Sequence, residues 1–278
     1  MTAPTLVPYR GTRPRPGLWA ACAFLALVCC AASFPALFAG APDQVDATAA
    51  LRGPGAGHPF GTDQLGRDVF ARVVYGARAS LFVGLGSTLL AGAAGSAWGL
   101  LAALGGRVAG EVAMRLADIL LAFPGVLTAL LVVAVLGPGT RNATLAITVA
   151  LAPGFARVVR VQALLVRNSA YVRAATNLGL RPRRVLRRHI VPNTLAPLLV
   201  LATLNVGTAV IAGASLSFLG LGPRPPAPEW GSMLAQARNY LDVSWTLALF
   251  PGAAITLTVM SATAVGRALQ ARYERREP

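Results

Sequence analysis

Long apolar runs separated by short polar intervals dominate the chain. Each run is close to the roughly 20 residues that an α-helix needs to cross a bilayer. Six such runs follow one another, so the pattern predicts an all-α, polytopic membrane protein with about six transmembrane helices and with both chain ends on the same side. The predicted spans are 18–38, 81–104, 113–136, 143–161, 195–219 and 245–265.

The intervals between the runs predict a single membrane domain, because none is long enough for a soluble domain. The third and fourth runs are separated only by 137–142, where Gly137, Pro138 and Gly139 break a helix, which makes these spans antiparallel neighbours. We therefore expect this organisation: an N-terminal tail (1–17), a first helix (18–38), an outer loop (39–80), a membrane domain (81–268) with a basic loop at 167–192, and a C-terminal tail (269–278).

Composition limits the chemistry that the chain can perform. All 25 basic residues are arginine and the net charge is +15. Without lysine no P-loop can be built, so any ATP that drives this protein is hydrolysed by another chain. No arrangement of residues typical of catalysis occurs, and we expect no catalytic residue, no metal and no cofactor.

Arginine is unevenly distributed between the two sides that six spans define. The N-terminal tail holds three, the interval around 105–115 two, residues 157–188 nine and the C-terminal end four, whereas the opposite side holds seven. Because positive residues concentrate in cytoplasmic loops, both termini and the basic loop are predicted to be cytoplasmic. The loops 39–80 and 220–244 are then predicted to face outward.

The predicted spans contain almost no ionisable residue, and none of the 110 positions between Asp118 and Glu229 is acidic. Ion-coupled carriers and proton pumps usually need such groups inside the bilayer. Asp118 lies three residues after Arg115, which predicts a local ion pair on one helix. A transport function would therefore have to be driven from outside this chain or be passive.

The sequence of the basic loop predicts two short helices joined at a glycine. Residues 170–178 favour a helix, Gly179 suits a left-handed stop, and Pro182 suits the first turn of a second helix that would end before Pro192. The second helix places Arg183 four residues before Arg187, and Arg184 four before Arg188. Each like-charge pair costs about 0.2–0.5 kcal/mol in an isolated helix, so an anionic partner is expected.

Anionic lipid, nucleic acid and an acidic protein surface are the candidate partners. A helix-turn-helix that binds nucleic acid needs a soluble helical core, and a membrane span begins a few residues after this loop, so we expect no nucleic acid. The lipid bilayer and a protein partner both stay open. The small residues Ala174 and Ala175 and the sharp turn favour a cleft on another protein.

A family resemblance rests on this loop and on motifs around it. Ala174, Ala175 and Gly179, followed by Ile190-Val-Pro192, resemble the cytoplasmic coupling loop of ABC-importer permeases. From about Trp19 to Ala268 the chain is similar to the second permease of the dipeptide/oligopeptide/nickel importer family. The further motifs, in order, are His58-Pro-Phe-Gly-Thr-Asp-Gln-Leu-Gly-Arg-Asp68, Leu121-Ala-Phe-Pro124, Arg157-Val-Val-Arg160, Ala214-Ser-Leu-Ser-Phe-Leu-Gly-Leu-Gly222 and Glu229-Trp-Gly-Ser-Met-Leu234.

The resemblance implies an ABC importer permease fold in the cytoplasmic membrane of a bacterium or archaeon. It implies translocation of peptides or related small solutes, with cytoplasmic ABC ATPase subunits, a homologous second permease and an extracytoplasmic solute-binding protein as partners. The residues that the resemblance implies for ATPase coupling are Arg173, Ala174, Ala175, Gly179, Arg183, Arg184 and Arg187.

Three positions depart from the family pattern. Arg173 and Gly213 stand where the family usually has glutamate, and Arg267 stands where an acidic residue is usual. The departure at Arg173 bears on how the ATPase is contacted. A rival hypothesis is a membrane structural or signalling protein whose arginine-rich loop binds anionic lipid or an acidic regulator.

Two further groups of residues lie in the predicted outer loops. Glu229 and Trp230 end a proline-rich segment, for which both docking of a binding protein and a rigid loop cover are open readings. His58, Asp63 and Asp68 lack the spacing of a metal site, so a role in turns and helix capping is expected.

Overall fold

The computed structural model describes residues 16–274, and within this range the chain is helical apart from turns, loops and one isolated bridge between Thr62 and Asp68. Most of the predicted tails, residues 1–15 and 275–278, lie outside the described residues. The helices are α1 (Pro16–Ser33), α2 (Val69–Leu104), α3 (Arg107–Leu121), α4 (Gly125–Leu136), α5 (Thr140–Arg167), α6 (Ala170–Asn177), α7 (Pro182–Val185), α8 (Val191–Phe218), α9 (Trp230–Ala237) and α10 (Thr246–Glu274).

Five helical runs are long and apolar enough to cross a membrane: α1, α2, α5, α10 and the run Pro182–Phe218 that contains α7 and α8. A bent pair, α3 with α4, makes a sixth when it is counted as one span. The predicted all-α membrane protein is thus confirmed. Helix α2 begins at Val69, well before the predicted start at residue 81, because Asp68 caps it by accepting a hydrogen bond from the Phe70 N–H.

The third predicted span, 113–136, is wrong as one straight helix. Helices α3 and α4 are bent by 93° at a break over residues 122–124. Pro124 disfavours helical backbone at the residue before it, and the chain restarts as a helix only after Pro124. The predicted tight turn that follows is confirmed, since Gly137 and Gly139 have positive φ and α5 begins at Thr140.

Glycines allow the central helices to pack closely. Gly95 and Gly99 of α2 face α5: a Cβ added at Gly95 would stand 2.5 Å from the Phe155 Cβ, and one at Gly99 would stand 2.9 Å from the Val159 Cβ. Helix α8 packs on α2 in the same way, since a Cβ at Gly213 would stand 2.7 Å from the Val83 side chain. Glutamate at position 213 therefore has no room in this packing.

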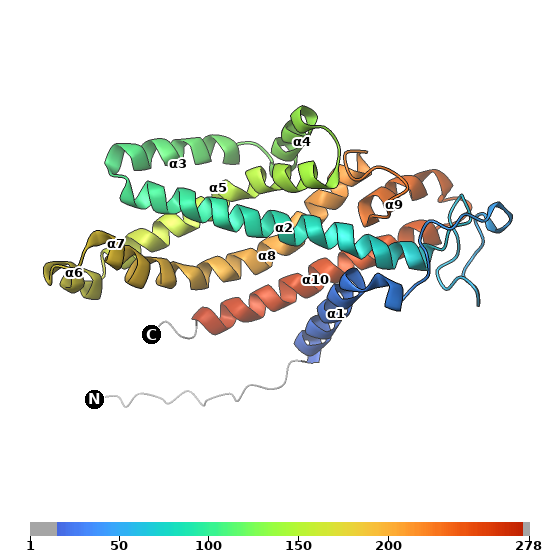
Figure 1. Cartoon of the computed structure of the whole chain (residues 1–278), viewed down its shortest axis with the longest axis horizontal. Helices are drawn as coiled ribbons and strands as arrows, with labels where there is room; N and C mark the ends of the chain where they lie inside the picture. The colour runs from blue at the N-terminus through green and yellow to red at the C-terminus, as the bar shows by residue number, and fades with distance from the viewer. Residues whose placement is uncertain (1–15, 275–278) are drawn as a thin grey trace, which may run out of the picture.

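The bundle has two distinct ends (Figure 1). Helices α6 and α7 extend beyond the end of α2 at one end of the molecule, and the end of α10 points the same way. The loop that leads into α2 and helix α9 lie at the opposite end. The basic loop and the outer loops predicted from the sequence are therefore far apart, as a membrane between them requires.

Candidate functional site: the coupling segment and the opposite charged cluster

Helix α6 ends in a turn that only glycine adopts easily. Gly179 has a φ of +81°, its N–H donates to the Thr176 carbonyl at 3.0 Å, and the Leu180 N–H donates to the Ala175 carbonyl at 3.2 Å. These two bonds form the Schellman motif that closes many helices. The left-handed stop predicted at Gly179 is confirmed, and it fixes the direction in which the chain enters α7.

The prediction that the second helix of the basic loop ends before Pro192 was wrong, because the helical run that starts with α7 passes this proline. Pro182 does occupy the first turn of α7, as predicted, but the helix continues through a π-helical segment, Leu186–Ile190, into α8. The Val191 N–H donates to the carbonyl of Leu186, five residues earlier. Because proline has no N–H and crowds the carbonyl four residues before it, a wider turn lets the helix pass Pro192 without breaking.

The inner face of this region is buried on the bundle. Val172 of α6, Val185 of α7 and Ile190 form an apolar cluster with Ala103 at the end of α2 and Ala163 of α5. Arg167 adds a hydrogen bond from its guanidinium to the Ala103 carbonyl at 3.1 Å. We call residues 170–190 the coupling segment; it is attached to α2 and α5 by packing and to α8 by a continuous helix.

The outer face of the coupling segment combines apolar and basic residues. Tyr171, Ala174 and Leu178 share one exposed face of α6, with Leu178 82% exposed. Arg173 is exposed and Ala175 half-buried. Five exposed arginines line a hollow on α7 and its flanks: Arg181, Arg183, Arg184, Arg187 and Arg188.

Glu229 and Trp230, at the other end of the molecule, are buried rather than displayed. Glu229 caps α9 by accepting from the Gly231 and Ser232 N–H groups at 2.9 and 2.8 Å, and it also accepts from the Ser80 hydroxyl at 3.1 Å. The Trp230 indole donates to the Val73 carbonyl at 2.8 Å. Both side chains therefore join α9 to α2 instead of offering a docking surface in this conformation.

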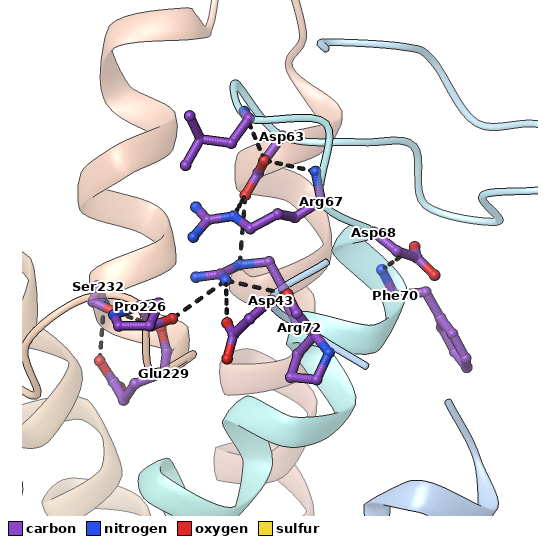
Figure 2. Close-up of polar contacts among 11 residues, drawn as sticks. Asp43, Asp63, Arg67, Asp68, Phe70, Arg72, Pro226, Glu229 and Ser232 are labelled. Carbon is purple, nitrogen blue, oxygen red and sulfur yellow. Dashed lines mark hydrogen bonds and ion pairs between the residues drawn. The ribbon is translucent and has the colours of Figure 1, made fainter. Parts of the chain in front are cut away.

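A buried charged cluster holds the outer loops to α2 (Figure 2). The Arg72 side chain is 2% exposed; its Nη1 donates to Asp43 at 3.3 Å and to the Pro42 and Pro226 carbonyls at 3.4 Å, and its Nε lies 3.6 Å from Asp63. Asp63 also accepts from the Arg67 Nε at 2.7 Å. Nearby, hydrogen bonds from the Thr48 hydroxyl and N–H lower the pKa of Asp46.

The sequence signalled this cluster only in part. The predicted turn role of Asp63 is confirmed, because it accepts from the Leu65 and Arg67 N–H groups. The burial of Arg72 and its role in joining the loops were not predicted, because its partners are spread along the sequence from Pro42 to Pro226. The predicted pairing of Asp118 with Arg115 is replaced by an ion pair of 2.6 Å with Arg157 of α5.

The long apolar helices and the bent third span define a helical membrane protein, from one end of which a short helix pair protrudes. The comparisons agree: residues 95–277 match the family described as binding-protein-dependent transport system inner membrane component, and the chain belongs to this family. It is thus the permease component of an ABC importer, a multi-pass inner-membrane protein and not an enzyme, with ATP hydrolysed on a separate subunit.

Several curated relatives cover most of the chain. It is 44% identical over 221 residues to the dipeptide transport system permease protein DppC of Alkalihalophilus pseudofirmus, covering 79% of this chain and 72% of that one. It is 42% identical over 219 residues to the probable D,D-dipeptide transport system permease protein DdpC of Escherichia coli, with 79% and 74% covered. The glutathione transport system permease protein GsiD of Pectobacterium atrosepticum is 40% identical over 218 residues, with 78% and 72% covered.

A solved structure shares the fold. The MetNI methionine ABC transporter in an inward-facing conformation superposes with a TM-score of 0.59 at 20% identity, over 72% of this chain and 95% of that one.

Proposed function

We propose that this chain is the permease subunit of an importer for peptides, and that its coupling segment receives the movement of a cytoplasmic ATPase. The peptide class is supported by the names of the relatives, which cover dipeptides, a D,D-dipeptide and glutathione. The termini and the coupling segment are proposed to be cytoplasmic, as the arginine distribution favours. A second permease and a solute-binding protein complete the proposed complex.

The observation that carries this proposal is the two-sided character of the coupling segment. Its inner side is buried against α2 and α5 and its last helix runs on into α8, while Leu178 and Tyr171 are exposed on its outer side. A force applied to the outer side would therefore reach three central helices at once. An exposed apolar face at this position is unusual for a solvent-facing helix and suits a protein cleft.

A substitution that leaves every charge in place distinguishes this proposal from its rival, a membrane structural or signalling protein whose arginine-rich loop binds anionic lipid or an acidic regulator. Gly179→Val should disturb the turn, because β-branched residues are strained at positive φ. Gly220→Val is the matched control: Gly220 has a φ of +85° and open space around it, at the opposite end of α8.

The experiment is ATP-driven peptide uptake in membrane vesicles, with membrane insertion measured in parallel. We expect Gly179→Val to lose most of the uptake while insertion stays normal, and Gly220→Val to lose much less. Equal uptake by wild type and Gly179→Val would contradict the proposed docking geometry. If uptake is lost when the arginines of the segment are replaced but not in Gly179→Val, the result would support the lipid rival.

A further inference from the structure

The arginines of the coupling segment have no acidic partner within the structure. Among residues 16–274, the acidic side chains that form ion pairs all pair with residues outside this segment; they are Asp43, Asp63, Asp68, Glu111 and Asp118. Arg173 and the five arginines of the hollow are all exposed, and the chain carries no acidic residue between Asp118 and Glu229. Within the part of the chain that the structure describes, no carboxylate offsets their mutual repulsion, and an acidic partner chain would supply one.

The apolar side chains on the inner face fix the direction in which these arginines point. Val185 and Ile190 are buried against the bundle, at 7% and 3% exposure, so the arginines that alternate with them face away from it. The most exposed apolar residue of the segment, Leu178, precedes Arg181 by three positions and lies at the end of α6. The exposed surface of the coupling segment thus combines the apolar side chain of Leu178 with neighbouring arginines.

The length of the helical run indicates that Arg183 and Arg184 face a protein rather than lipid headgroups. The run Pro182–Phe218 has 37 residues, which is about 55 Å at 1.5 Å per residue. Along this axis Arg188 lies about 10 Å and Arg183 about 18 Å beyond Leu195, where the apolar part begins. The headgroup layer on one side of a bilayer is only about 5–8 Å thick, so Arg183 and Arg184 extend past it.

From these observations we infer that the ATPase subunit presents an acidic groove with an apolar floor: Leu178 enters the floor, and Arg183 and Arg184 pair with carboxylates on its rim. This inference rests on the proposed function and states the chemistry of its partner. Arg173 is also exposed on α6, where the family usually has a glutamate, so the charge at this position is reversed in this chain.

The test measures assembly of the reconstituted transporter with its cognate ATPase subunits in nanodiscs of neutral lipid. Arg183→Glu/Arg184→Glu is the probe variant, and Arg141→Glu/Arg224→Glu makes the same change of charge at two exposed sites outside the coupling segment, at the start of α5 and in the loop after α8. We expect the probe variant to weaken ATPase binding about tenfold or more and the control to leave it within about twofold. Reversing the acidic groove residues of the ATPase to arginine should restore binding to the probe variant.

Two outcomes with the probe variant overturn the inference, and a third calls for a second measurement. Unchanged binding by the probe variant shows that the rim is not acidic, while the wild-type complex itself still supports the proposed function. If binding of the ATPase is unchanged but transport requires phosphatidylglycerol in wild type and not in the probe variant, the arginines bind lipid. If the probe variant fails to insert, salt titration of the wild-type complex decides: at ionic strengths where the Debye length falls well below 10 Å, a complex that does not weaken contradicts the charge pairing.

Discussion

Arg72→Leu is the substitution that tests most sharply how the outer loops are held. The wild-type guanidinium touches three separate segments: residues 42–43, Asp63 and the carbonyl of Pro226. Leucine fills part of the same volume and makes none of these bonds. We expect the bundle to remain folded while the segment 42–63 and the loop at Pro226 come loose from α2.

The expected loss in the free energy of unfolding depends on the interactions that Asp63 and Asp43 retain after Arg72 is removed. Removing one partner of a buried ion pair costs about 3–5 kcal/mol, mainly because the other charge stays buried. Here Asp63 keeps Arg67 at 2.7 Å and two backbone N–H groups, and Asp43 is 47% exposed and can be hydrated. The expected loss in the free energy of unfolding is therefore at the lower end, about 3 kcal/mol. Arg67→Leu should cost more, since Asp63 would then keep its two backbone N–H donors but only the longer ion pair with Arg72, at 3.6 Å.

The assay is denaturant unfolding of the purified protein in mild detergent, combined with amide hydrogen exchange of residues 42–63. Faster exchange in this segment and little change in the centres of α5 and α8 are expected for Arg72→Leu. A loss below about 1 kcal/mol, or unchanged exchange in this segment, would refute the reasoning that a buried arginine ties the loops together.

Three further predictions concern packing, capping and a surface pair. Gly99→Val should lower thermal stability strongly, because its side chain would collide with Val159 and the α5 backbone, whereas Gly154→Ala, with open space around it, should be tolerated; melting curves in detergent compare them. Glu229→Ala should cost about 1–2 kcal/mol through the lost cap of α9, with Ser232→Ala, which keeps the cap acceptor, as a milder control in the same unfolding assay. Asp118→Asn should change the unfolding free energy by less than about 1 kcal/mol, because both members of its pair with Arg157 are about half exposed; a larger loss would mean that this pair is not a simple surface contact.

Features that depend on local sequence were predicted well. The apolar runs located the membrane helices, and Gly179, Pro182 and the 137–139 turn were recognised because their backbone requirements are local. The break between α3 and α4 could also have been found. Pro124 was visible inside the third run, but hydrophobicity alone gave no reason to divide a segment of suitable length.

Features that depend on distant contacts were not predictable from one sequence. The burial of Trp230 was not predicted, because its indole donates to the carbonyl of Val73, more than 150 positions away along the chain. The π-helical segment before Pro192 arises because α8 must continue past a proline while Ile190 stays packed on α2 and α5. Neither the bond between Trp230 and Val73 nor the packing of Ile190 on α2 and α5 can be inferred from the residues next to them in the sequence.

Site-specific photo-crosslinking from position 178 tests the central claim most directly. A photoreactive amino acid would replace Leu178 in the assembled importer, and in a control it would replace Val135, which is 81% exposed on α4, away from the coupling segment. The account predicts a covalent product with the ATPase subunit from position 178 and none from position 135. Crosslinks from position 178 only to lipid, in a complex that still transports peptide, would contradict it.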